Sequence, residues 1–206
     1  MRIRRISLGP LETNCWIVDD DAGGPAVVID PADEPTALLR ALDGTVVAAV
    51  VLTHGHFDHL GAAGALVETT GAPLLVHEQD APFITSPSGT GGAMFGFQLS
   101  APAADRTLAD GDTVEAGRIA LAVLHTPGHT PGCICLHAPG HLFSGDTLFA
   151  GSVGRTDFPR GDARALSESI ATRIAVLPDA TVVHPGHGPE TTIGRERLVN
   201  PFFPRA

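Results

Sequence analysis

The stretch Leu52-Thr53-His54-Gly55-His56-Phe57-Asp58-His59 places three imidazoles and a carboxylate within six consecutive positions. It follows directly on the apolar run 46–51, which predicts a buried strand. At the exit of an extended strand His54 and His56 point to the same side, because side chains repeat with a period of two. Imidazole nitrogen and carboxylate oxygen are ligands for zinc, iron and manganese. The stretch therefore predicts a metal site at a strand end.

Three further turns present the same kinds of side chain. His129, Asp146 and His187 each lie in a turn rich in glycine or proline, shortly after an apolar segment that predicts a strand. Sites of this kind are built from loops at strand ends, where the sheet beneath holds them rigidly. Four strand ends thus contribute seven side chains of ligand type, which is enough for two metal ions that share one carboxylate.

With these motifs the chain resembles the metallo-β-lactamase superfamily, and within it the single-domain branch similar to glyoxalase II (hydroxyacylglutathione hydrolase). The resemblance extends over nearly the whole chain. Besides the motifs above, it is carried by the segments Gly9–Trp16, Gly151–Phe158, Gly186–Thr192 and Asn200–Phe202.

The resemblance implies a fold and a set of metal ligands. The expected fold is α/β, a four-layer αββα sandwich of two mixed β-sheets flanked by helices, in a single domain spanning residues 1–206. The expected cofactors are two divalent metal ions, with zinc favoured and iron or manganese as alternatives. The ligands implied for one ion are His54, His56 and His129, those for the other are Asp58, His59 and His187, and Asp146 bridges the two.

Hydrophobic periodicity gives a coarse map of the elements. Strands are expected near 2–7, 14–19, 25–30, 46–52, 73–76, 112–115, 118–125, 132–138, 141–144 and 180–184. Helices are expected near 35–42, 59–69, 78–83 and 162–176. In the last of these helices one buried stripe is expected, formed by Leu166, Ile170, Ile174 and Leu177.

Composition restricts the function classes. The chain has 206 residues, of which 43% are hydrophobic and 17% charged, which favours a compact globule. The formal net charge of -10 argues against binding to nucleic acid or to an anionic membrane. The N-terminus lacks an apolar signal core, which favours the cytoplasm. The three cysteines are expected to be buried thiols rather than a disulfide scaffold.

The chemistry implied is hydrolysis by a hydroxide that bridges two metals, with Asp58 as the catalytic residue that orients the nucleophile and receives its proton. The expected substrate is a small-molecule thioester of a low-molecular-weight thiol, similar to S-lactoylglutathione. Two-domain glyoxalase II enzymes bind glutathione through cationic groups of a C-terminal helical domain. Here only nineteen residues follow His187, and lysine and tyrosine are absent from the sequence. Glutathione recognition therefore does not carry over.

The sequence is also compatible with other functions of this fold. Persulfide dioxygenases of the same fold also resemble the chain, and they hold one iron on the equivalents of His54, His129 and Asp146. A non-catalytic flavin-linked or scaffold domain of this fold, and a β-lactam hydrolase, are less consistent with the sequence. The non-catalytic domains often lose ligands, whereas this chain retains all seven.

Several residues outside the ligand set have two readings. Asp30 is either a support of the metal loop or a plain turn carboxylate. Arg155 and Asp157 form either a structural ion pair or a substrate contact. The long irregular segment 85–105, which contains Met94, Phe95 and Phe97, forms either an apolar wall of the substrate cleft or a surface flap. His125 and His184 are candidates for support of the ligands, and Thr53 and Thr130 are expected to cap backbone groups.

Overall fold

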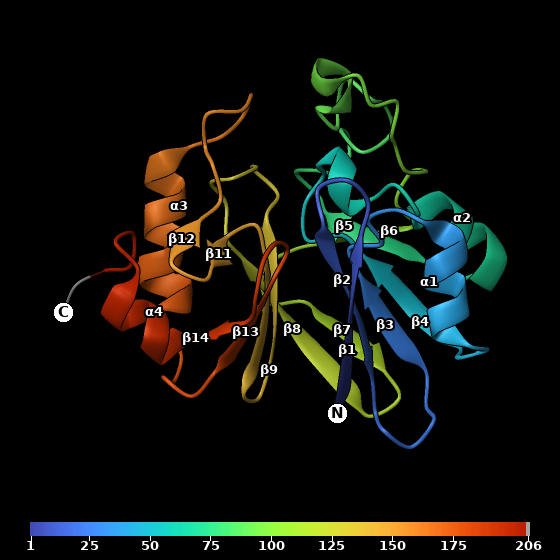
Figure 1. Cartoon of the computed structure of the whole chain (residues 1–206), viewed down its shortest axis with the longest axis horizontal. Coiled ribbons are helices and arrows are strands. Elements are labelled where there is room, and N and C mark those ends of the chain that lie inside the picture. The colour runs from blue at the N-terminus through green and yellow to red at the C-terminus, as the bar shows by residue number, and fades with distance from the viewer. Residues whose placement is uncertain (205–206) are drawn as a thin grey trace.

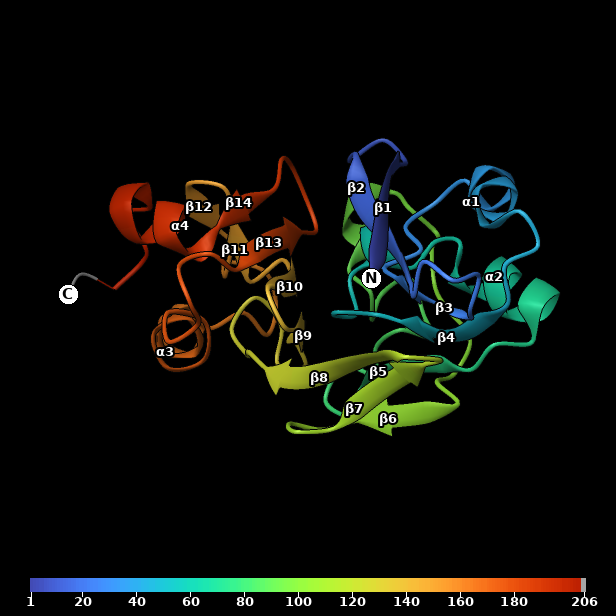
Figure 2. The same ribbon diagram turned by 90° about the horizontal axis from the view of Figure 1, so that it is seen from below.

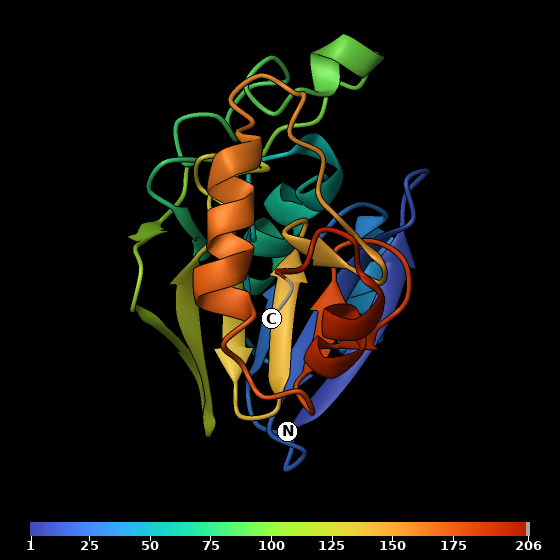
Figure 3. The ribbon, with the colours of Figure 1, turned by 90° about the vertical axis from the view of Figure 1, so that its left-hand side faces the viewer.

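Two β-sheets pack face to face, and helices cover both outer faces (Figure 1). The computed structural model describes residues 1–204. Helices α1 and α2 lie on one side and α3 and α4 on the other, with the two six-stranded sheets between them (Figures 1 and 2). The view from the side of α3 and α4 shows both helices lying across the sheet behind them (Figure 3). The predicted αββα sandwich of two mixed sheets is confirmed.

The elements are as follows. The first sheet has the order β1 (Arg2–Leu8), β2 (Thr13–Asp19), β3 (Ala26–Ile29), β4 (Val47–Val51), β5 (Leu74–His77) and β6 (Arg106–Leu108). The second has the order β14 (Thr191–Thr192), β13 (Val182–Pro185), β10 (His141–Gly145), β9 (Ile134–Ala138), β8 (Ile119–His125) and β7 (Thr113–Ala116). The helices are α1 (Pro35–Leu42), α2 (Ala63–Thr70), α3 (Ala163–Ser169) and α4 (Ile193–Val199), and a small hairpin is formed by β11 (Leu148–Phe149) and β12 (Ser152–Val153).

Strand directions in the second sheet bring three of the ligand loops together. Strands β8 and β10 are both antiparallel to β9, and β13 is parallel to β10. The carboxyl ends of β8, β10 and β13 therefore lie at the same edge of the sheet. The loops that follow these strands carry His129, Asp146 and His187.

The alternation of side chains along the strands divides the interior into three apolar clusters, one for each pair of neighbouring layers. In β2, Cys15 and Ile17 pack toward α1 and α2, whereas Trp16 and Val18 belong to the cluster between the sheets. In β10 the same period places Phe143 between the sheets. The second sheet packs against α3 and α4 through a third cluster. This pattern is the period-two signature of strands that are buried on both faces.

One expected helix is wrong. Residues 78–83 form consecutive turns, in which the backbone N–H groups of Asp80 and Ala81 both donate to the carbonyl of His77. Pro82 has no N–H to continue a helix. The side chain of Asp80 is also bound to two other loops, as described below, and this fixes the turn.

Two further helices differ from expectation at their ends. The helix expected at 59–69 begins only at Ala63, after a short 3₁₀ turn at Phe57–His59 that orients the ligand side chains. The helix expected at 162–176 is capped by Asp162, as its acidic start indicated, but widens into a π-helical turn at Ile170–Ile174. The short strands β6, β11, β12 and β14 and the helix α4 were not expected, because segments of two to seven residues carry little periodicity.

The chain contains no helix in residues 1–204 that is long and apolar enough to cross a membrane. Its cysteines, Cys15, Cys133 and Cys135, are buried free thiols, as expected. Burial raises the pKa of the Cys135 thiol to about 11, which keeps this group protonated near neutral pH.

The expected apolar stripe of the 162–176 segment is buried against the second sheet, and Ile170 at its centre is 1% exposed. Replacing Ile170 by Ala should lower the free energy of unfolding by about 2–5 kcal/mol, because it removes buried methyl groups and leaves a cavity. Denaturant unfolding measures this change. Val176→Ala is the matched control, since Val176 is 70% exposed and its truncation should change stability little. Equal effects of the two variants would contradict this packing.

Candidate metal centre

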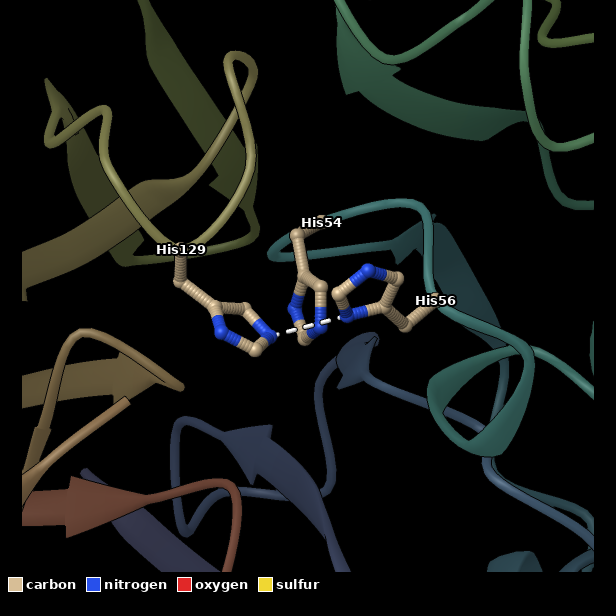
Figure 4. A group of neighbouring side chains, drawn as sticks. All are labelled: His54, His56 and His129. Carbon is tan, nitrogen blue, oxygen red and sulfur yellow. Dashed lines mark hydrogen bonds between the residues drawn. The ribbon is translucent and has the colours of Figure 1, made fainter. Parts of the chain in front are cut away.

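Seven side chains converge at the edge where the two sheets meet. Their donor atoms form three overlapping groups, and in each group these atoms lie within 4.8 Å of one another. Figure 4 shows the first group, in which His129 approaches His54 and His56 from a loop on the opposite side. The groups are His54/His56/His129, His54/His59/Asp146 and Asp58/His59/His187.

Asp146 lies between the two ligand sets that the sequence predicted. Its carboxylate oxygens are 3.6 Å from Nε2 of His129 and 3.7 Å from Nε2 of His187. A third contact, of 3.3 Å, joins it to Nε2 of His59. The carboxylate therefore reaches both sets, as a bridging ligand must.

Hydrogen bonds fix the orientation of the imidazoles. Where the Nδ1–H of a ring donates to an oxygen outside the cluster, the lone pair on Nε2 is left facing the cluster, which is the arrangement typical of metal-ligating histidines. Three such bonds are present: from His59 to Asp30 Oδ2 at 3.0 Å, from His129 to the carbonyl of Arg155 at 2.7 Å, and from His187 to the carbonyl of Leu11 at 3.1 Å.

Asp30 supports the ligand loop from behind. It accepts hydrogen bonds from the backbone N–H and the hydroxyl of Thr53, both at 2.7 Å, in addition to the bond from His59. The Thr53 hydroxyl in turn lies 3.2 Å from Nδ1 of His54. Of the two readings of Asp30, the supporting role is confirmed. Thr53 binds this carboxylate through its hydroxyl and is not a backbone cap.

Buried polar atoms without partners test whether the residues fit a metal. Among residues 1–204 four buried side-chain atoms lack a hydrogen-bond partner, and three of them are His54 Nε2, His59 Nε2 and Asp146 Oδ1. An unpaired buried polar atom costs about 1–3 kcal/mol, so three in one place require an explanation. A divalent cation bound to imidazole nitrogen and carboxylate oxygen satisfies all three. The donor set therefore fits divalent metal ions.

The pKa shifts of the clustered histidines show the electrostatic environment of the site. Burial and the imidazoles of His59 and His129 hold the pKa of His54 well below its ordinary value, and burial lowers that of His56 to about 3. Both rings are therefore neutral and able to ligate. Burial acts against a charge on His59, yet the carboxylates of Asp146, Asp58 and Asp30 raise its pKa well above the ordinary value. The negative potential of these carboxylates favours a cation bound within the cluster.

Asp80 joins two ligand loops and was missed by sequence reasoning. It is 1% exposed and accepts hydrogen bonds from the Gly55 N–H at 2.8 Å, the Thr130 hydroxyl at 2.7 Å and the Gly132 N–H at 2.8 Å. Gly55 lies between His54 and His56, and Thr130 follows His129. Because Asp80 stands outside every motif and its partners are distant in sequence, no local signal identified it.

Asn14 ties the loop of His187 to the first sheet. Its backbone N–H donates to the carbonyl of Gly186 at 2.7 Å, and its side-chain amide donates to the carbonyls of Pro185 and Gly188. The indole N–H of Trp16 also donates to Pro185. Asn14 and Trp16 belong to the segment Gly9–Trp16 that carried the family resemblance, and these bonds show what that segment does physically.

The predictions for the other polar residues near the cluster have different outcomes. His125 donates to the carbonyl of Pro131 and His184 pairs with Glu190, and neither has a hydrogen bond to the seven side chains. Thr130 binds Asp80 rather than capping backbone. Arg155 and Asp157 form the expected ion pair with two contacts of 2.7 Å, and the guanidinium lies 3.8 Å from the centre of the Phe158 ring.

A pocket with a cavity volume of about 540 Å³ opens directly over the cluster. His56, Asp58, His129, Asp146 and His187 form part of its lining. The segment 85–105 lines it as well, through Met94, Phe95 and Phe97. The segment thus contributes apolar side chains to the wall of this pocket, in line with the first of its two readings.

The sequence pattern of the Metallo-beta-lactamase superfamily matches residues 8–187, which include all seven clustered side chains. The chain belongs to the metallo-β-lactamase superfamily. Among its relatives, hydroxyacylglutathione hydrolase GloC of Haemophilus influenzae is 36% identical over 209 residues, covering 98% of both chains. Membership and this relative support a metal-dependent hydrolase.

Solved structures share the fold. The B3 metallo-beta-lactamase BLEG-1 is 37% identical, with a TM-score of 0.92 and coverage of 98% of this chain and 99% of that one. TTHA1623 in a di-iron-bound form is 41% identical, with a TM-score of 0.86 and coverage of 97% and 100%. ETHE1 from Myxococcus xanthus is 31% identical, with a TM-score of 0.81 and coverage of 98% and 84%. The di-iron form of TTHA1623 means that the fold does not by itself assign zinc.

Replacing Asp80 by Asn should weaken metal binding about 10–100-fold, as expected for a group that orients ligands. The amide keeps the size of the carboxylate, but its NH₂ group then faces a backbone N–H of Gly55 or Gly132. Metal affinity is measured by competition with a chelator. Asp112→Asn is the control, because Asp112 accepts one backbone hydrogen bond from Ala109 away from the centre. An unchanged affinity in Asp80→Asn would remove Asp80 from the support of the centre.

Proposed function

We propose that this protein is a dinuclear-metal hydrolase that cleaves thioesters of low-molecular-weight thiols. The observation that carries the proposal is the pair of adjoining donor groups around Asp146 at the floor of a pocket with an apolar wall. The similarity to hydroxyacylglutathione hydrolase GloC supports the same reaction class. The partner is a small molecule, and the acidic net charge of -10 favours neither nucleic acid nor an anionic membrane.

The residues that would hold the metals are those that the family resemblance implies. His54, His56 and His129 would bind one ion, and Asp58, His59 and His187 the other, with Asp146 shared. When bound, two divalent cations lower the pKa of a shared water toward neutrality and polarise the acyl carbonyl. We assign zinc as the preferred ion, with iron or manganese as alternatives.

Asp58 is the residue best placed to move the proton. Its carboxylate lines the pocket and lies 3.2 Å from Nε2 of His187 and 3.4 Å from the hydroxyl of Thr13. Burial acts to raise the pKa of Asp58, but His59 and His187 outweigh it and hold the pKa below its ordinary value. The group is therefore a carboxylate that can orient the attacking water and accept its proton.

In the proposed hydrolysis one bond forms and one bond breaks at the acyl carbon. The water oxygen forms a bond to the acyl carbon, and the C–S bond breaks with its electron pair on sulfur. The proton held by Asp58 passes to the departing thiolate, so that the products are a carboxylic acid and a free thiol. The aromatic side chains around the pocket exclude other water from the reacting carbonyl.

A second candidate is persulfide dioxygenase activity with a single iron held by His54, His129 and Asp146. The similarity to ETHE1 from Myxococcus xanthus is the observation that favours it. The segment Gly186–Thr191 resembles the hydrolase branch more than the dioxygenases, which favours hydrolysis.

Metal content separates the two candidates. Protein purified without added metal should contain about two divalent ions per chain, because both donor groups are complete, and it should hydrolyse S-lactoylglutathione or another thioester. Elemental analysis and release of free thiol measure the two properties. One iron per chain together with oxygen consumption on a persulfide would instead establish the second candidate.

Alanine at His56 or at Asp146 should abolish thioester turnover, with a loss of at least about 100-fold, because each change opens a donor group. Metal occupancy should fall together with activity. Circular dichroism should stay that of the parent, since the three apolar clusters do not include these side chains. His137→Ala is the control, because His137 lies in β9 and outside the donor groups. Near-normal rates in either site variant would make the dinuclear mechanism wrong.

A further inference from the structure

Apolar side chains make up much of the pocket lining. The largest group of them is here called the aromatic wall: Phe57, Met94, Phe95, Phe97 and Phe158. Leu11, Phe149 and Val153 line the pocket as well. The ring of Phe57 stacks on those of Phe97 and Phe95, with centroids 4.9 Å and 6.0 Å apart. The ring centroids of Phe95 and Phe158 are 5.6 Å apart. The rings therefore form one continuous surface.

This surface begins at the metal centre itself. The ring of Phe158 meets His56 edge-on, with centroids 5.7 Å apart and planes at 86°. Phe57 stands in the sequence between His56 and Asp58, two of the proposed ligands. A group bound at the centre therefore has the aromatic wall directly beside it.

The outer part of the aromatic wall is uncovered. Met94 is 64% exposed and Phe95 is 50% exposed, although both line the pocket. Large apolar side chains exposed together around a pocket mark a surface that a ligand covers. Gly91 and Gly96, with φ of 80° and 81°, bracket the turn that carries Met94 and Phe95, and they permit small movements of the turn over a ligand.

The polar side chains of the pocket, apart from the proposed ligands, lie mainly at its rim. Ser88, Ser152, Arg155 and Arg160 are all exposed. A low-molecular-weight thiol carries amide or charged groups, and their burial against carbon without hydrogen bonds is costly. The carrier is therefore better accommodated at the rim, which leaves the aromatic wall to the other arm of the thioester.

We infer that the aromatic wall binds the acyl group, and that the substrates carry an apolar acyl chain of several carbons or an aromatic acyl group rather than a small hydroxyacyl group. This inference rests on the proposed thioester hydrolysis and names its substrate class. Phe95 and Met94 are then specificity residues, because they extend the apolar surface beyond the reach of a two- or three-carbon acyl group.

The test is a series of acetyl, butyryl, hexanoyl and octanoyl thioesters, together with the lactoyl thioester, each made on glutathione and on N-acetylcysteamine. In the metal-loaded parent protein kcat/KM should rise by up to about fourfold for each methylene group that reaches the aromatic wall. In Phe95→Ala and Met94→Ala this dependence on chain length should flatten, so that kcat/KM with the octanoyl thioester falls by a larger factor than kcat/KM with the lactoyl thioester. Because both side chains are exposed, their truncation should leave the fold intact, and the melting temperature checks this.

Phe202→Ala is the matched control, because Phe202 is 56% exposed and lies outside the pocket lining. It should keep the full chain-length dependence. Hydrolysis that is independent of acyl length, or a gain that follows the thiol carrier, would overturn the acyl assignment and leave the proposed hydrolase intact.

A binding measurement separates the inference from the proposed function. By calorimetry, octanoate should bind the parent protein at least about tenfold more tightly than lactate, and Phe95→Ala should lose this preference. If no thioester is hydrolysed but this preference is found, the hydrolase proposal is wrong and the aromatic wall is still an apolar-chain site. Equal binding of octanoate and lactate would overturn the inference regardless of turnover.

Discussion

The carboxylate of Asp146 lies at the junction of the two sheets and is only 8% exposed, so solvent balances little of its charge. Burial of such a group costs several kcal/mol unless cationic or hydrogen-bonding partners surround it. Those partners are His59 from the first sheet and His129 and His187 from the second, at 3.3–3.7 Å. Because both sheets contribute, polar contacts join the two sheets at this edge. The same constraint explains why unpaired buried atoms collect here, ready to be satisfied by cations.

Two other carboxylates keep the surrounding loops in place. Asp30 holds the loop of His54 and His59 from the first sheet, and Asp80 joins that loop to the one carrying His129. Neither loop is a regular helix or strand, so its backbone groups find these side chains instead. A site held by buried hydrogen bonds has donor atoms in place before a metal arrives, and less ordering is needed on binding.

The centre combines two opposed environments within a few ångströms. The donor groups require polar neighbours, whereas the rings from Phe57 to Phe158 present only carbon. The 3₁₀ turn Phe57–His59 makes the transition, because Phe57 belongs to the aromatic wall whereas Asp58 and His59 belong to a donor group. A thioester has the same division, with a reactive polar carbonyl beside arms of different polarity, and this match connects the fold to the proposed reaction.

The sequence by itself indicated most of the strands and the seven clustered side chains through local patterns, and its family resemblance implied the sandwich. Strand burial appears as alternation over a few residues, as in β2, and the donor residues stand in short turns directly after such strands. Only the tertiary structure decided the roles of Asp80 and Asn14, whose partners lie up to 52 and 174 residues away. It also showed that 78–83 is a turn, in which Pro82 lacks an N–H and the side chain of Asp80 is bound to two other loops. Contacts between loops depend on how two sheets pack, and no local period encodes that packing.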